Sequence, residues 1–123
     1  MANPENQFRF QELEIWRRAA GISGQLFRLA DELEQHRLRR FAEQLRGATL
    51  SITNNIAEGS GSVSKVDFAH FLNTARRSVF EVANILAILT KEKYLPDANV
   101  TSLLTELEQQ SRMILAFIRH LKR

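Results

Sequence analysis

Apolar residues recur every three or four positions along most of this chain, which is the spacing of residues that share one face of an α-helix. The clearest run lies just past the middle of the sequence. Its members are Phe68, Phe71, Ala75, Ser78, Val82, Ile85 and Leu89. Comparable runs precede and follow it, so the pattern predicts four helices, over residues 11–33, 38–57, 65–91 and 97–121.

The four predicted helices are joined by short connections, which favours neighbours that run antiparallel. We therefore predict an all-α fold, an antiparallel up-down-up-down four-helix bundle. Residues 10–123 would form its single domain. Residues 1–9, which are mostly polar and include Pro4, would form a flexible N-terminal arm.

Small and polar residues separate the second and third predicted helices. Glycine readily adopts the left-handed conformation that closes a helix, so the Gly/Ser segment 59–62 is expected to end the second helix. Ser64 and Asp67 have the spacing of a capping pair at the start of the third helix. Pro96 disfavours continuation of that helix and precedes the fourth.

Polar residues interrupt the apolar faces of the second and fourth helices. Ser51, Asn55 and Glu58 form a strip beside the apolar residues Leu38, Phe41, Leu45, Ala48 and Ile52. Two interpretations of the strip are open: a hydrogen-bond network that fixes the packing register, and a recognition site. Gln110 interrupts the fourth helix, where its amide would either form a buried hydrogen bond or reach solvent.

The apolar faces of the first and third helices are wide, because each carries a second run beside the first. A wide face serves either a bundle core alone or a core together with a subunit interface. The candidate interface residues are Trp16, Leu72, Arg76 and Val79. Arg76 falls on the second run of the third helix, so we expect it to pair across a helix or subunit boundary.

The charge of the chain is modestly basic but rich in arginine. Seventeen basic and fourteen acidic residues give a formal charge of +3, and thirteen of the basic residues are arginines. The planar guanidinium can pair with two oxygens of a phosphate or of a carboxylate. The arginines therefore favour either phosphate binding or salt bridges between subunits.

Three groups of basic residues are candidates for contact with nucleic acid. One is the pair Arg76 and Arg77 inside the third helix. Of the other two, the first lies at the turn into the second helix and extends along it, and the second ends the chain. The residues are Arg37, Arg39, Arg40 and Arg46 in the first group and Arg119, Lys122 and Arg123 in the second. Each of these two groups also has a structural explanation without phosphate contact. The first would simply be solvated at a turn, and the second would complement the dipole at the C-terminus of its helix.

The sequence gives little basis for catalysis. It has no cysteine, its three histidines lie on separate segments, and its Gly/Ser segment lacks the lysine of a phosphate-binding loop. We expect a protein that is not an enzyme and needs no cofactor or metal. The absence of a long apolar run and of a signal-peptide pattern leads us to expect a soluble, cytoplasmic protein without membrane contact.

The sequence resembles the bacterial 23S rRNA intervening-sequence proteins over nearly its whole length. The resemblance rests on segments 10–19 and 44–59, on Lys93-Tyr94-Leu95, and on single positions of the third helix. Those positions are Ser64, Asp67, Phe68, Phe71, Leu72, Ala75, Ser78 and Glu81. The stretch Asn55 to Gly59, NIAEG, is its most specific part. Gly47 replaces a basic residue of the family pattern, and Arg77 replaces a glycine.

The resemblance implies an antiparallel four-helix bundle, often assembled as a ring-shaped homopentamer, with no established enzymatic activity. Distant relatives include accessory proteins of diversity-generating retroelements, which bind nucleic acid and a polymerase. We therefore expect a noncatalytic homo-oligomer that binds RNA or DNA through arginine-rich surfaces. The alternative is a homo-oligomeric scaffold or accessory subunit that binds a protein partner.

Overall fold

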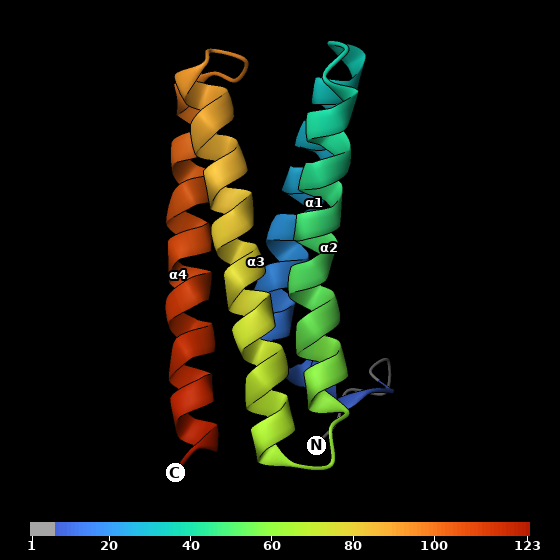
Figure 1. Ribbon diagram of the computed structural model, residues 1–123, viewed down its shortest axis with the longest axis vertical. Helices are drawn as coiled ribbons and strands as arrows, with labels where there is room; N and C mark the ends of the chain where they lie inside the picture. The colour runs from blue at the N-terminus through green and yellow to red at the C-terminus, as the bar shows by residue number, and fades with distance from the viewer. Residues whose placement is uncertain (1–6) are drawn as a thin grey trace.

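Four long helices make up most of the chain in a computed structural model, which describes residues 7–123 (Figure 1). A short 3-10 helix, η1, precedes them. The elements are η1 (Arg9–Glu12), α1 (Glu14–Gln35), α2 (Arg39–Ser60), α3 (Lys65–Lys91) and α4 (Asp97–Leu121). The described residues contain no strand, which confirms the all-α prediction.

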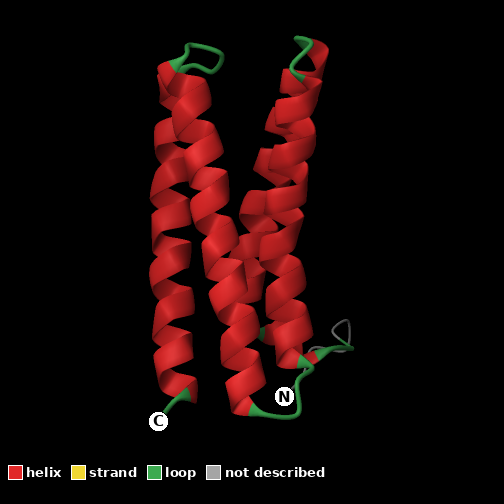
Figure 2. Ribbon diagram, viewed as in Figure 1, coloured by secondary structure: helices red, strands yellow, loops and turns green. Residues whose placement is uncertain are grey.

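Successive helices run in opposite directions, as predicted (Figure 1). The α1–α2 and α3–α4 turns lie together at one end of the bundle, which we call the turn end. The α2–α3 connection, η1 and the C-terminus lie at the other, which we call the loop end (Figure 2). None of the helices within residues 7–123 combines the length and apolar character that crossing a membrane requires.

The ends of the last two helices agree with the pattern of the sequence, because they carry clear local signals. The side chain of Ser64 accepts a hydrogen bond from the backbone N–H of Asp67 at 3.1 Å and so caps α3. Pro96 occupies the N-cap of α4. At the N-terminus of the bundle the chain differs from the prediction, since a 3-10 turn precedes α1 and α1 itself begins at Glu14.

The second helix continues past the point where glycine was expected to end it. It runs through Gly59 to Ser60, and none of the described glycines has a positive φ. A Cβ placed on Gly59 would lie 2.8 Å from Phe68 Cδ1 and 2.8 Å from Phe71 Cβ. Gly59 is therefore needed for the close approach of α3, and its conformational freedom is not used.

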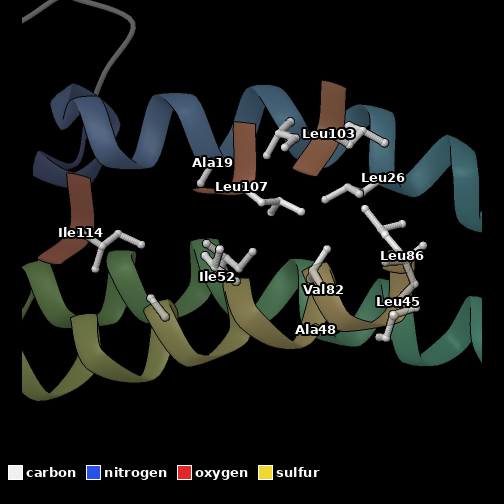
Figure 3. Close-up of a cluster of buried hydrophobic side chains, with 14 of the residues drawn as sticks. Ala19, Leu26, Leu45, Ala48, Ile52, Val82, Leu86, Leu103, Leu107 and Ile114 are labelled. Atoms are coloured by element: carbon white, nitrogen blue, oxygen red, sulfur yellow. The ribbon is translucent and has the colours of Figure 1, made fainter. Parts of the chain in front are cut away.

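All four helices contribute to one apolar core. Figure 3 shows side chains from each helix directed into the space between them, and the labelled residues are Ala19, Leu26, Leu45, Ala48, Ile52, Val82, Leu86, Leu103, Leu107 and Ile114. In α2 the predicted apolar face is turned slightly, because Ala42 is fully buried and Phe41 is partly exposed. The burial of this apolar surface is the main stabilising contribution to the fold.

Gln110 is buried in this core and bridges two helices. Its Nε2 donates a hydrogen bond to the backbone carbonyl of Ile15 at 2.8 Å. Of the two environments open to this residue, the structure places it in the buried one. The bond links the middle of α4 to the first turn of α1 and satisfies an amide that would otherwise be buried at a cost of about 1–3 kcal/mol.

The predicted N-terminal arm lies partly outside the described residues, which begin at Gln7. Phe8 and Arg9 lie against the bundle. The ring of Phe8 stacks on Phe10 at 5.7 Å between centroids, and the guanidinium of Arg9 lies 5.5 Å from the centroid of the Phe68 ring. Phe10 in turn packs edge-on against Trp16 at 5.1 Å. These contacts make residues 8 and 9 part of the folded unit.

Candidate nucleic-acid interface

The two turns at the turn end are built in the same way. In the first, the N–H of Leu38 bonds to the carbonyl of Leu33 at 2.8 Å, and the N–H of Arg37 bonds to that of Glu34 at 3.1 Å. In the second, the N–H of Tyr94 bonds to the carbonyl of Leu89 at 2.8 Å, and the N–H of Lys93 bonds to the carbonyl of Thr90 at 3.0 Å. Both are Schellman motifs, which satisfy the last carbonyls of a helix.

The left-handed residue of each motif is basic. Arg37 and Lys93 both have φ of 65°, where glycine is the usual residue and a side chain costs roughly 1–2 kcal/mol. Both side chains are exposed. Each turn therefore holds a cation in a fixed backbone conformation at the end of the molecule.

An aromatic contact joins these two turns. The ring centroids of Phe41 on α2 and Tyr94 in the α3–α4 turn lie 6.4 Å apart, with the ring planes inclined by 35°. This places Lys91 and Lys93 on the same end of the bundle as the predicted arginines. We call Arg37, Arg39, Arg40, Lys91 and Lys93 the basic end. The two lysines escaped sequence reasoning, since only the tertiary fold brings their turn beside the first.

Carboxylates neutralise part of the predicted arginine group. Arg39 Nε lies 3.0 Å from Glu43 Oε1, one turn further along the same helix. Arg46 Nη2 lies 2.7 Å from both Asp31 Oδ1 and Glu34 Oε2 on α1. These two hydrogen bonds raise the pKa of Arg46 above its usual range. With both carboxylates bound, Arg46 joins α1 to α2, and its predicted contact with nucleic acid stays a prediction.

The second predicted basic group lies far from the first. Arg119, Lys122 and Arg123 are exposed at the loop end, where the chain ends (Figure 1). A helix of 22 residues such as α2 is about 33 Å long. Within one chain, the two groups therefore cannot bind the same few phosphates.

A shallow hollow lies beside Tyr94 at the basic end. It has a volume of about 490 Å³ and is lined by Thr90, Lys91, Lys93, Tyr94, Leu95, Pro96 and Asp97. The ring of Tyr94 is 54% exposed, whereas its neighbour Leu95 is buried. The hollow thus combines two cations, one carboxylate and an accessible aromatic face.

The polar strip of α2 forms a small network with α3. Asn55 Nδ2 donates to the carbonyl and the hydroxyl of Ser51 at 2.8 and 3.0 Å, and the Ser51 hydroxyl lies 2.8 Å from that of Ser78. Glu58 is exposed and takes no part in these bonds. The geometry of Ser51 and Asn55 is that of a packing contact between two helices, and Ser78 is the partner that the sequence did not point to.

Two of the predicted interface residues are already used within the chain. Leu72 and Val79 are buried in the core of the chain, so their side chains offer little surface to another subunit, and their role at an interface stays a prediction. Trp16 is partly buried against Phe10. Arg76 Nε donates to the carbonyl of Ser111 on α4 at 3.2 Å, so it pairs across a helix boundary.

The aromatic residue that α3 exposes near Arg76 is Phe80. Its ring is 57% exposed and lies 5.1 Å from the Arg76 guanidinium. It borders an apolar hollow of about 200 Å³ between α3 and α4, lined by Val79, Phe80, Ala83, Leu104, Leu107, Glu108 and Ser111. Phe80 belongs to neither apolar run of its helix, since it lies on the outer side of the second run, beside Arg76.

The family model of the 23S rRNA-intervening sequence proteins matches residues 11–116. This match covers α1, α2, α3 and most of α4. The chain belongs to this family.

Comparison with solved structures gives the same fold. A protein of unknown function from the S23 ribosomal protein family of Bacteroides thetaiotaomicron has a similar structure, with a TM-score of 0.81 and 19% sequence identity. The similarity covers 85% of this chain and 97% of the other. No curated protein matches the chain.

Gly47 and Arg77, where the resemblance suggested departures from the family pattern, both lie on the surface. Gly47 is exposed, and a Cβ built there meets nothing within 4 Å, so a larger residue would fit equally well. Arg77 is exposed on α3 and not at a helix contact. The specific NIAEG stretch, in contrast, supplies Asn55 to the polar network and Gly59 to the close contact with α3.

Proposed function

We propose that this chain is a noncatalytic nucleic-acid-binding protein that contacts phosphates through its basic end. The observation that carries the proposal is the aromatic contact of Phe41 with Tyr94. It joins two turns that lie far apart in the sequence into a single surface. On that surface, Arg37, Arg40, Lys91 and Lys93 add to the charge of Arg39, which is ion-paired.

Cations and carboxylates are present in nearly equal number at this end, so an anion would bind through the exposed cations Arg37, Arg40, Lys91 and Lys93. Glu43 is paired with Arg39, and Asp31 and Glu34 are paired with Arg46. Glu92 and Asp97 lie near the α3–α4 turn and partly offset its lysines. Contacts made by such exposed cations would release counterions from the nucleic acid, so binding should weaken as salt rises. They would position the strand without reading its sequence.

Replacing three cations at each end in turn tests the proposal. In the basic-end variant Arg37, Arg40 and Lys93 become Gln, and in the control Arg119, Lys122 and Arg123 become Gln. Affinity for a structured RNA and for a DNA duplex is measured by fluorescence anisotropy across a salt series. The basic-end variant should bind more weakly, and the slope of log affinity against log salt should fall by roughly one for each phosphate that the variant no longer binds.

The control variant separates a local site from general charge. It carries the same reduction of charge at the far end and should keep most of the affinity. Equal weakening by both variants, or no weakening by the first, would contradict a phosphate site at the basic end.

A second function, assembly into a homo-oligomer or onto a protein partner, is favoured by the apolar hollow beside Phe80. An exposed aromatic next to an apolar depression is typical of interface anchors. Membership of the intervening-sequence family makes a homopentamer the form to expect from the resemblance.

The assembly proposal is tested by mass in solution. Phe80→Lys should reduce the mass towards that of one 14.1 kDa chain, as measured by light scattering after size exclusion, while the circular dichroism spectrum stays helical. Val66→Lys is the matched control, because Val66 is 65% exposed on the same helix but lies at the loop end. An unchanged mass in the Phe80 variant would argue against this face.

A further inference from the structure

We infer that the basic end takes single-stranded nucleic acid and stacks an unpaired base on the ring of Tyr94. The inference rests on the proposed function and specifies its ligand. Single-strand binding combines cations that follow the backbone with aromatic faces on which bases stack, and both features lie at this end of the molecule.

The backbone holds Tyr94 in place while its ring stays accessible. Its N–H is bonded to the carbonyl of Leu89 at 2.8 Å, and the next side chain, Leu95, is anchored in the core. The ring is nevertheless 54% exposed, and it is supported on one side by Phe41, which is itself 39% exposed. A ring supported in this way can receive a base without first becoming ordered, which reduces the entropic cost of binding.

The hollow beside the ring has the size and chemistry for one nucleotide. It is an open depression of about 490 Å³, in which one nucleotide can lie against the ring without being enclosed. Lys91 and Lys93 lie on its rim as phosphate partners. Asp97 lines it as well, and its carboxylate would repel a phosphate but can accept a hydrogen bond from an amino group of a base.

A base within a duplex cannot reach such a ring without leaving its stack. Flipping a paired base costs a few kcal/mol, and this surface is a shallow hollow that does not surround an extruded base. A single strand, a loop or a frayed end presents its bases without that cost. The geometry therefore favours unpaired nucleotides over a continuous duplex.

The test uses a ten-nucleotide RNA with 2-aminopurine at its centre, alone and annealed to its complement. Stacking quenches the fluorescence of 2-aminopurine, so the chain should quench the single strand more than the duplex. Tyr94→Leu should remove this quenching and weaken single-strand binding by about 5- to 150-fold, since one base–aromatic stack contributes about that factor. Binding of the duplex should not change.

Two further variants serve as controls. Tyr94→Phe keeps the ring and should retain both the affinity and the quenching. Phe8→Leu removes a ring that is 62% exposed at the loop end and should have no effect on either. Thermal unfolding of each variant is followed by circular dichroism, so that a loss of binding can be separated from a loss of fold.

The outcomes separate this inference from the proposal on which it rests. If single strand and duplex bind equally and Tyr94→Leu changes neither, the stacking inference is overturned, while phosphate binding at the basic end stands. If neither RNA binds even at low salt, both fail. Quenching that persists in a folded Tyr94→Leu variant would also overturn the inference, because the base would then lie elsewhere.

Discussion

The contact between α2 and α3 differs from the contact between α1 and α4 in the kind of side chain that joins the helices. Between α2 and α3, small residues allow a close approach, since Gly59 leaves room for Phe68 and Phe71, and Ser51 bonds to Ser78. Between α1 and α4, long polar side chains form bridges beside the shared apolar core. Small residues let helix backbones approach closely, whereas long polar side chains join helices that lie further apart.

The bridges between α1 and α4 illustrate the second arrangement. Arg18 Nη2 reaches Gln109 Oε1 at 2.9 Å and Glu106 Oε2 at 3.6 Å, and Gln110 bonds to the carbonyl of Ile15. Further towards the turn end, a polar groove of about 390 Å³ separates the two helices, lined by Gln25, Arg28, Leu29, Glu32, Ala98, Asn99, Ser102 and Leu103. In Figure 2 the α1–α2 and α3–α4 pairs also diverge towards the turn end.

The largest effect is expected from adding a methyl group to the close contact. Gly59→Ala would place a Cβ 2.8 Å from Phe71 Cβ, an atom fixed to the backbone of α3, so the helices must move apart. Overpacking of this kind costs about 1–3 kcal/mol, more than the roughly 1 kcal/mol that alanine gains in helix propensity. Urea unfolding measures the difference.

Gly47→Ala is the matched control on the same helix. Nothing lies within 4 Å of a Cβ at Gly47, so this variant should be more stable than the parent by up to about 1 kcal/mol. If both glycine variants were stabilised alike, the close contact at Gly59 would not limit packing.

A smaller effect is expected at the buried bridge of the wider contact. Gln110→Leu fills a similar volume but removes the hydrogen bond to Ile15, for which the expected loss is about 0.5–1.5 kcal/mol. The exposed neighbour Gln109 bonds to Arg18, and Gln109→Leu should change the free energy of unfolding by less than about 0.5 kcal/mol. Equal losses of unfolding free energy in the two variants would show that burial of the Gln110 amide does not determine its contribution to stability.

The smallest effect is expected at the exposed bridge. Arg18→Gln breaks the ion pair with Glu106, and partly exposed pairs of this kind contribute about 0–1 kcal/mol. The loss should also shrink in 1 M salt, where the charges are screened. A large loss that does not depend on salt would mean that Arg18 acts through its packing against Met113 and not through its charge.

The sequence predicted best where the signals are local. Ser64 and Asp67 at the start of α3, and Pro96 at the start of α4, set helix ends that agree with the structure. The apolar periodicity was sufficient for the bundle, because one wide stripe on each helix must face the others. The periodicity was less accurate about which residues of a stripe are buried. It placed Phe41 on the apolar face of α2, whereas the adjacent Ala42 is the one that is buried.

The candidate site was less predictable, because it depends on contacts between residues far apart in the chain. The sequence identified Arg37 and Arg40, but the pairing of Arg46 with Asp31 and Glu34 requires the angle at which α1 meets α2. The place of Lys93 beside the first turn likewise follows from the tertiary fold. No local spacing encodes either contact.

At the left-handed positions Arg37 and Lys93, stability of the backbone favours glycine, whereas surface charge favours a basic residue. Glycine at either position would relieve a strain of roughly 1–2 kcal/mol, so a protein engineer who optimised helix caps would choose it at both turns. That choice would remove two of the five cations of the basic end. A thermostable redesign of this chain should therefore leave these two positions unchanged if its surface charge is to be kept.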